Sequence, residues 1–372
     1  MSRSPYFLES EPALVAVLDD FLARLAANLE RQPFRSSVAT LVLGGGYGRG
    51  EGGVFRMRET GRAHFYNDLD FCLFVKGRKD AAAIAAWCHR WERDGTAELG
   101  IEVEFKRLPA DAFRRSGPTM FYHDLLQGHW VVWGDAGVMT GAPTAHRNAR
   151  LIPLSESARL LFNRGSGLLF ARWKLKEEPS DADGFIERNH AKARLALADA
   201  VLAAAGRHDG SCVERARRLA SEKFPVPANF AQLRAWHAEG VQFKLQPRHR
   251  RPGVAALKEA QQELTAAWLD VFLWLESGRL GHDFANGGNY FAWSGRLFPE
   301  TSRVWNLLLH GRDRIKRGSA LPDWFDYPRS SLQRALVAAH MSHLSEADAA
   351  RFIGEGADSW RAAYRRWWGH YN

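Results

Sequence analysis

Two stretches decide the fold of the N-terminal part of this chain: LGGGYGRGEGG at residues 43–53 and NDLDF at residues 67–71. Residues 37–43 are rich in valine, threonine and leucine, which predicts a strand that ends at the glycines. The glycines themselves predict a tight turn or the start of a helix. Residues 68–76 first alternate and then become continuously apolar, which predicts a second, largely buried strand.

The segments around these stretches supply the rest of an α/β domain. Leucines and phenylalanines recur at a spacing of three and four between residues 10 and 30, which predicts an amphipathic helix. The alanine-rich residues 80–93 predict another helix, and the strict alternation of residues 101–108 predicts a third strand. Residues 121–135 add a short helix and a final apolar piece. We therefore predict an α/β (α+β) domain with a mixed sheet over residues 1–147.

The composition and the periodicity of the sequence change near residue 150. Residues 157–176, 186–205, 211–221 and 254–277 are rich in leucine and alanine and have helical periodicity. Linkers are predicted at residues 178–184, 246–253 and 318–328, where glycine, proline and polar residues gather. Because 372 residues exceed one small core, we predict a second domain, an all-α helical bundle over residues 148–372.

The acidic residues of the predicted strands are the candidate catalytic groups. Asp68 and Asp70 are two apart, so a strand would place both side chains on one face. Adjacent carboxylates repel each other unless a cation lies between them, and Mg²⁺ is typically bound by one or two carboxylates with substrate phosphates. Glu102 and Glu104 lie on one face of the third predicted strand, and either could supply a third acid. If the strands are neighbours, three carboxylates meet, as two-metal phosphoryl or nucleotidyl transfer requires.

The glycine turn supplies the complementary part of such a site. Its backbone N–H groups, free of side-chain bulk, are suited to phosphate oxygens, and Arg49 adds a charged planar donor. Taken singly, a glycine cluster is typical of an ordinary turn, and an acid-x-acid strand is typical of a solvated strand face. The order of strand, glycine turn, acid pair and acidic third strand is much more specific.

In this order the motifs resemble the DNA polymerase β-like nucleotidyltransferase superfamily. The turn at residues 45–51 is similar to that family's Gly-Ser-x-x-x-Gly-Glu turn. Asp68 and Asp70 look like its metal-binding acid pair, and the strand of Glu102 and Glu104 looks like the one that carries its third acid. The resemblance favours Glu104 for this role, with Glu102 in reserve. The resemblance covers about residues 38–135, and the helical region is similar only in general terms to the substrate domains of aminoglycoside-type members.

The resemblance implies an activity and a set of site residues. It implies Mg²⁺-dependent transfer of a nucleoside monophosphate from ATP or another nucleoside triphosphate to a hydroxyl group, with release of pyrophosphate. Two Mg²⁺ ions would be held by Asp68, Asp70 and Glu104. The residues expected to bind the triphosphate are Gly45, Gly46, Tyr47 and Arg49.

Two departures from the family pattern leave an alternative open. Gly46 replaces the serine of the family's turn, so one hydroxyl contact to the triphosphate is missing. The segment at residues 52–67 is longer than usual, which predicts a hairpin or a flap. The alternative is a catalytically inactive, nucleotide-binding sensor on the same fold.

Charge and composition bear on partners and compartment. The net charge of +9 favours polyanionic partners, but no dedicated RNA-binding module is present, so a small-molecule acceptor is preferred over nucleic acid. Lys192, on a predicted helix, would reach the triphosphate if that helix faced the cleft. No run of 18 apolar residues occurs and no secretory signal is apparent, so we expect a cytoplasmic protein without a membrane partner.

Two further motifs are interpreted as structural. Residues 48–53 match the dinucleotide fingerprint G-x-G-x-x-G with Asp68 twenty residues on, but the expected acid should end a strand rather than begin one. Arg334 and His340 have the Arg-x-x-x-x-x-His spacing of helical ribonucleases. In a chain so rich in arginine and histidine, this pair is interpreted as a helical surface pair.

Overall fold

A computed structural model of the chain describes residues 5–177, 184–226, 229–248, 252–318, 320–341, 344–356 and 358–372. The described residues form two compact units. The first unit comprises the chain up to residue 153 together with residues from 205–223 and 234–249, and the second comprises the remainder. This division differs from the predicted boundary at residue 147, because two segments predicted for the helical domain belong to the first unit.

A mixed four-stranded sheet forms the centre of the first unit, with the strand order β5-β4-β1-β6. Strand β1 is antiparallel to both of its neighbours, whereas β4 and β5 are parallel. A separate antiparallel hairpin, β2 with β3, fills the long segment at residues 52–67, as predicted. The strands are β1 (Val38–Leu43), β2 (Gly53–Arg56), β3 (Ala63–Tyr66), β4 (Leu69–Val75), β5 (Val103–Pro109) and β6 (Trp130–Gly134).

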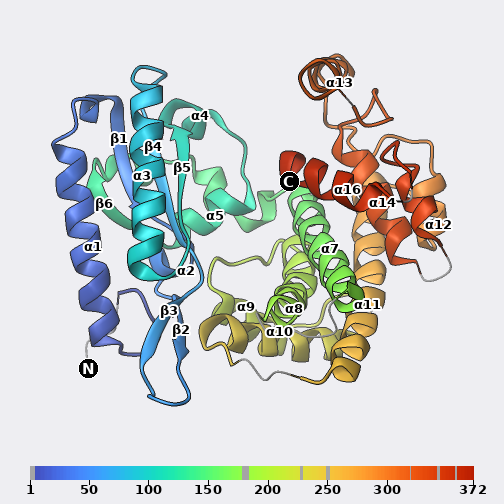
Figure 1. The fold of residues 1–372 in the computed structure, drawn as a ribbon, viewed down its shortest axis with the longest axis horizontal. Coiled ribbons are helices and arrows are strands. Elements are labelled where there is room, and N and C mark those ends of the chain that lie inside the picture. The colour runs from blue at the N-terminus through green and yellow to red at the C-terminus, as the bar shows by residue number, and fades with distance from the viewer. Residues whose placement is uncertain are drawn as a thin grey trace. The chain divides into compact units, whose positions relative to one another are not determined.

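Helices cover both faces of this sheet (Figure 1). On one face α1 (Pro12–Glu30) and α3 (Ala81–Leu99) share a core with the strands, in which Phe71 stacks on Phe105 with ring centroids 4.8 Å apart. On the other face Cys72 and Phe74 pack with residues of α4 (Ala110–Arg115), α5 (Met120–Gln127) and α6 (Gly137–Thr140). The alternation of β4 therefore buries both of its faces, as a central strand requires.

Two later segments join the first unit through specific hydrogen bonds. The carboxylate of Glu51 accepts hydrogen bonds from the hydroxyl group of Ser211 and the backbone N–H of Cys212, at the start of α9 (Cys212–Ser221). Asn67 donates from its side-chain amide to the carbonyl of Lys244, 3.1 Å away, in α10 (Phe230–Leu245). These contacts connect residues more than 150 positions apart in sequence.

The second unit is helical, and the helices predicted at residues 157–176, 186–205 and 254–277 are confirmed. Its core is rich in buried aromatic side chains, among them Trp173, Trp268 and Trp360. The helices are α7 (Leu154–Glu177), α8 (Phe185–Ala204), α11 (Val254–Leu280), α12 (Gly287–Ala292), α13 (Arg303–Arg317), α14 (Arg329–His340), α15 (Glu346–Ala350) and α16 (Trp360–Tyr371). Of the predicted linkers, residues 178–183, 249–251 and 319 lie outside the described residues.

Within the described part of the chain, no helix has both the length and the apolar character that crossing a membrane requires.

Candidate functional site

Asp70 and Glu104 are direct partners in the pairing of β4 with β5. Because the two strands are parallel and in register at this position, both side chains leave the same face of the sheet at neighbouring points. The Asp70 side chain is 27% exposed and that of Glu104 is 49% exposed. Two of the three predicted acids are therefore brought together, as the neighbouring-strand argument expected.

Lys106 joins this pair, and the sequence reading missed it. Its ammonium nitrogen lies 3.7 Å from a carboxylate oxygen of Asp70 and 3.7 Å from one of Glu104. It also lies 5.3 Å from the centre of the Phe121 ring. The alternation that places Glu104 on this face places Lys106 there two residues later, so the signal was present in the sequence.

The electrostatics of the pair reflect its burial. Burial raises the pKa of Asp70, and the charges of Asp68 and Glu104 raise it further, against the opposing effects of Lys106 and Arg49; the net pKa is raised. Burial alone would lower the pKa of Lys106, but the two carboxylates outweigh this and raise it. Ionisation of the Asp70 carboxyl group therefore costs free energy, and a bound cation would reduce this cost.

Asp68 lies one residue before the strand that was predicted to contain it. Strand β4 begins at Leu69, and the preceding Asn67 has a left-handed backbone with φ of 70°. Asp68 therefore lies before the strand and is exposed. Its charge still raises the pKa of Asp70. Glu102, the reserve acid, is also exposed, and its backbone carbonyl accepts a hydrogen bond from the N–H of Leu69.

A closed metal cage is not formed by these side chains. Among the described residues, no group of three or more histidine, cysteine, aspartate or glutamate side chains is arranged to hold a metal ion. The oxygen donors that strand pairing brings together at this point of the sheet are Asp70 and Glu104.

The glycine turn meets Asp70 directly. The Gly44 N–H donates to the Asp70 carbonyl at 2.8 Å, and the short helix α2 (Gly45–Gly48) follows. Gly45 has φ of 59°, and a Cβ at this position would lie 2.2 Å from a carboxylate oxygen of Asp70. The first helical hydrogen bond runs from the Gly48 N–H to the Gly44 carbonyl. The N–H groups of residues 45–47 precede it and are the ones a helix start presents to an anion.

The next two turn residues have different roles. A Cβ on Gly46 would lie 3.0 Å from the Glu51 carbonyl oxygen, so the serine of the family's turn would fit only after a small shift of the backbone. The Tyr47 side chain is buried, and its hydroxyl group donates to the Tyr66 carbonyl and accepts from the Tyr66 N–H. The Tyr47 ring therefore belongs to the core, which leaves only its backbone N–H for a phosphate.

Arg49 is held against the backbone of residues 128 and 210. A Cβ on Gly128 would lie 2.5 Å from the Arg49 side chain, and one on Gly210 would lie 3.3 Å from it. Its charge acts on both Asp70 and Asp124. Within the described residues its buried Nε has no hydrogen-bond partner. A buried donor without a partner is costly, so Arg49 is suited to an anionic ligand.

Asp124 and Glu51 form hydrogen bonds near the glycine turn. A carboxylate oxygen of Asp124 lies 2.8 Å from Nε2 of His208. Burial would raise the pKa of Asp124, but the hydrogen bond from His208 and its charge, with those of Arg49 and Arg215, lower it overall. Burial likewise opposes the charge of Glu51, but the hydrogen bond from Ser211 and the charge of Lys244 lower its pKa overall. Both carboxylates are therefore stabilised in their charged form.

Lys192 is exposed on α8, in the second unit. Its expected contact with a triphosphate stays a prediction.

The structure shows the surroundings of the glycine motif at residues 48–53 and of the pair Arg334 and His340. Gly53 begins strand β2 instead of opening a helix, which removes the context that a dinucleotide fingerprint needs. The prediction that Arg334 and His340 form a surface pair is wrong, since both are buried. Arg334 donates to backbone carbonyls, including that of Trp293 at 2.6 Å, and His340 lies 2.9 Å from the carbonyl of Gly165. Burial, aided by the charge of Arg172, lowers the pKa of His340 to about 3.

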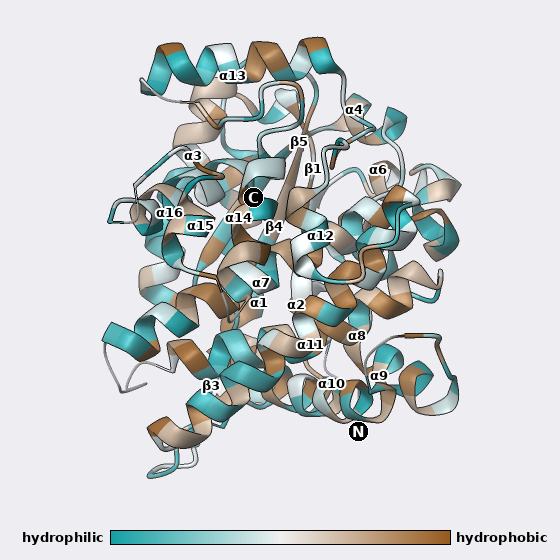
Figure 2. Ribbon diagram, turned by 90° about the vertical axis from the view of Figure 1, so that its right-hand side faces the viewer, coloured by the Kyte–Doolittle hydropathy of each residue, from teal (hydrophilic) through white to brown (hydrophobic). Residues whose placement is uncertain are grey.

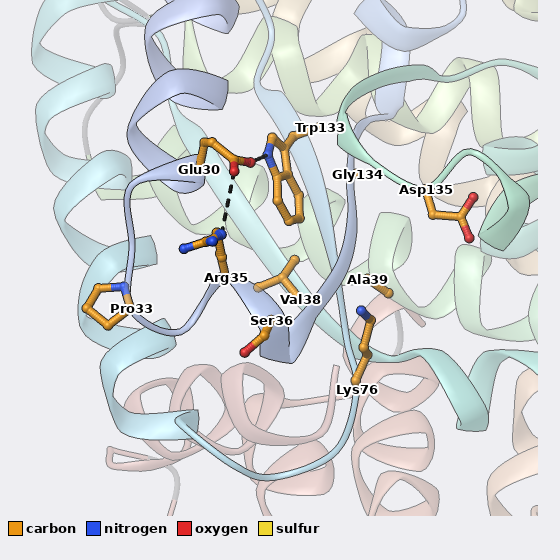
Figure 3. Close-up of a pocket in the computed structure, with 10 residues that line it drawn as sticks. All are labelled: Glu30, Pro33, Arg35, Ser36, Val38, Ala39, Lys76, Trp133, Gly134 and Asp135. Carbon is orange, nitrogen blue, oxygen red and sulfur yellow. Dashed lines mark hydrogen bonds and ion pairs between the residues drawn. The ribbon is translucent and has the colours of Figure 1, made fainter.

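A pocket of about 460 Å³ lies at the opposite end of β1 from the glycine turn (Figure 3). In it Glu30 pairs with Arg35 and accepts a hydrogen bond from the Trp133 indole, so its two oxygens already have partners. The predicted acids and turn residues are not among its lining residues, which are Glu30, Pro33, Arg35, Ser36, Val38, Ala39, Lys76, Trp133, Gly134 and Asp135.

A comparison of the sequence with models of known protein families and with curated proteins finds no match.

Proposed function

We propose that this chain is a Mg²⁺-dependent nucleotidyltransferase. It would transfer a nucleoside monophosphate from ATP or another nucleoside triphosphate to a hydroxyl group of a small-molecule acceptor and release pyrophosphate. The observation that carries the proposal is the pairing of Asp70 with Glu104 beside a glycine turn whose Gly45 packs against the Asp70 carboxylate.

Different residues of the first unit would bind the triphosphate and the metal ion. The N–H groups of residues 45–47 and the guanidinium of Arg49 would bind the triphosphate. Asp70 and Glu104 provide carboxylate oxygens, the ligands that Mg²⁺ prefers, and this pair fits one ion completed by substrate phosphates. When bound, Mg²⁺ would offset phosphate charge and favour loss of the proton from the attacking hydroxyl group. The second ion that the resemblance implies would need Asp68 and stays a prediction.

Attack of the acceptor oxygen on the α-phosphorus forms the new ester bond, and the bond to the β-phosphate breaks. The hydroxyl proton leaves to a base, and the electron pair leaves with pyrophosphate. The task of the protein in such a transfer is mainly to hold the reactants in line and to stabilise charge. The fixed turn and the paired strands provide rigid supports for this task.

The state of the cysteines bears on the cellular compartment of the protein. Cys72, Cys88 and Cys212 are all buried free thiols, which supports a reducing compartment such as the cytoplasm. A small acceptor remains preferred over nucleic acid.

One observation favours a second candidate, a nucleotide-binding sensor without catalysis. The Lys106 ammonium lies 3.7 Å from an oxygen of each of the two carboxylates, where it offsets part of their charge without a metal ion. With Gly46 in place of serine, the site would then bind a nucleotide but not activate it.

Isothermal titration with ATP, in the presence and absence of Mg²⁺, tests binding. Transfer is tested with ATP labelled at the α-phosphate and, in parallel, at the γ-phosphate, across a panel of hydroxyl-bearing acceptors. A nucleotidyltransferase labels the acceptor only from the α-phosphate and releases pyrophosphate. Asp70→Asn should abolish the transfer, whereas Asp111→Asn, at an exposed aspartate, should not.

The outcomes separate the candidates. Binding without transfer or pyrophosphate release across the panel would favour the sensor. Label transferred from the γ-phosphate would identify a kinase. A lack of ATP binding both with and without Mg²⁺ would exclude both proposed functions.

A further inference from the structure

Helix α13 of the second unit is amphipathic in the opposite sense from a normal surface helix. The side chains it buries are mostly polar: Asn306, His310 and Asp313, together with Leu309. Asn306 donates to the carbonyl of Phe325, and Asp313 accepts a hydrogen bond from the hydroxyl group of Tyr371. The helix thus contacts its unit largely through polar side chains, and its apolar side chains other than Leu309 are left for the outer face.

The outer face carries a continuous apolar stripe, which we define as Val304, Leu308, Gly311 and Ile315. The spacing of four, three and four residues places these positions in one line along the helix. Val304 is 68% exposed, Leu308 60% and Ile315 85%. A Cβ added at Gly311 would meet nothing within 4 Å. Trp305 and Leu307, beside the stripe, are exposed as well.

Cationic side chains border the stripe on both sides. Successive residues of a helix are rotated by about 100° around its axis. Arg312 and Lys316 therefore lie along one edge of the stripe, and Arg303 and Arg314 lie along the other. All four are exposed. The one acidic residue of the helix, Asp313, points inward and is buried. Figure 2 shows the resulting mixture along α13, where hydrophobic segments alternate with hydrophilic ones.

A concentrated apolar patch on a surface marks an interaction site, because single exposed apolar residues are usually scattered. An apolar stripe bordered by lysine and arginine matches the helices that lie in the interface of an anionic membrane, with apolar side chains in the acyl boundary and cations at the headgroups. We propose that α13 is a peripheral docking site for an anionic lipid surface. This role needs no membrane-spanning helix, but it departs from the expectation, drawn from the sequence, that the protein has no membrane partner.

The charges argue against the other occupants. In a second copy of α13, every charged side chain on the outer face would again be a cation, so paired stripes would repel along both edges. Nucleic acid would match the cations but would leave Val304, Leu308 and Ile315 without an apolar partner. A partner protein would need an apolar groove lined by acids, whereas a lipid interface adapts to a protruding helix without one.

Sedimentation with vesicles tests the proposal on the full-length protein. We expect binding to vesicles of phosphatidylcholine with one third phosphatidylserine, and little binding to phosphatidylcholine alone. Leu308→Glu combined with Ile315→Glu should weaken binding at least about tenfold, because two inserted apolar side chains are lost. Arg314→Gln combined with Lys316→Gln should weaken it by about tenfold or more, with a smaller dependence on salt.

Val17→Glu is the matched control, since Val17 is an exposed apolar residue on α1 outside the stripe. It should leave vesicle binding unchanged, and thermal unfolding should show that all variants are folded. Failure of the wild type to bind the anionic vesicles, equal binding to neutral vesicles, or full binding by the Leu308→Glu/Ile315→Glu variant would overturn the proposal. A dimer that dissociates with this variant would overturn it too, because a second copy would then cover the stripe.

Discussion

The Nζ atom of Lys106 lies 3.7 Å from Oδ1 of Asp70, on the face of the sheet that also carries Glu104. An ammonium group at this point has the charge sign of a metal ion and contacts the same oxygens. It offsets part of the repulsion between the two neighbouring carboxylates in the absence of a divalent ion. It also means that a divalent ion must compete with a group of the protein itself.

Removal of this competing charge should strengthen Mg²⁺ binding. In Lys106→Met the apolar stem is kept and the ammonium is lost, so we expect the Mg²⁺ affinity to rise about three- to tenfold. Titration calorimetry with Mg²⁺ and no nucleotide measures this change. The matched control is Lys76→Met, at an exposed lysine that follows the far end of β4. An unchanged or weaker Mg²⁺ affinity in Lys106→Met would show that the ammonium does not occupy the place of an ion.

A pair of glycine substitutions separates backbone strain from contact with Asp70. Gly45 and Gly61 both have positive φ, but a Cβ on Gly61 meets nothing within 4 Å, whereas one on Gly45 would overlap a carboxylate oxygen of Asp70. Gly61→Ala should therefore cost only the strain of the left-handed conformation, about 1–2 kcal/mol. Gly45→Ala should cost about 1–3 kcal/mol more and should also weaken ATP binding.

Urea unfolding gives the free energy of unfolding of each variant, and titration with ATP and Mg²⁺ gives the affinity. Equal costs for the two substitutions would mean that the turn moves away from Asp70 without difficulty. In that case the contact between the turn and the acid would not be a fixed part of the site.

The elements of the first unit could be predicted because their sequence patterns are periodic and local. The runs at residues 10–30, 37–43 and 101–108 form α1, β1 and β5, and every end lies within two residues of the predicted one. The pairing of Asp70 with Glu104 followed from the assumption that their strands are neighbours, which the register confirms. A strand pattern carries this information, because it fixes which side chains share a face.

The remaining features depend on contacts that no local pattern records. Asp68 lies just before β4 and follows Asn67, which has a left-handed backbone and donates a hydrogen bond to the carbonyl of Lys244, far along the chain. The place of residues 205–223 in the first unit depends on the hydrogen bonds between Glu51 and the start of α9. Their helical periodicity is the same whichever core the helix packs on, so the sequence assigned them to the helical domain.

The contact between Glu51 and α9 should be visible in stability and in its pH dependence. Glu51→Gln keeps the shape of the side chain but loses the negative charge that accepts from Ser211 and Cys212. We expect the free energy of unfolding to fall by about 1–2 kcal/mol near neutral pH, because hydrogen bonds to a charged group at a helix start are the stronger ones.

The sign of the pH effect follows from the lowered pKa of Glu51. A carboxylate whose pKa is lower in the folded state stabilises the fold above its unfolded pKa, and loses this effect as the pH falls through the folded pKa. The difference between wild type and Glu51→Gln should therefore close in acid. Glu59→Gln, in the exposed tip of the hairpin, is the control and should show no such difference. A gap that stays constant down to acid pH would contradict the assigned role of the charge.

Asp70 should behave in the opposite way, because burial raises its pKa in the folded state. A raised pKa means that the ionised carboxylate destabilises the fold at neutral pH, and that this cost disappears as the pH falls through the folded pKa toward the unfolded one. Asp70→Asn should therefore be more stable than the wild type at neutral pH and equal to it in acid. Asp111→Asn, at an exposed site, should show no pH-dependent difference of this kind.

Added Mg²⁺ should make the wild type more stable than Asp70→Asn at neutral pH, since only the wild type gains stability from binding the ion. Thermal unfolding across pH, with and without Mg²⁺, measures both effects. An Asp70→Asn variant that is less stable at neutral pH without Mg²⁺ would show that Lys106 already compensates the carboxylate fully.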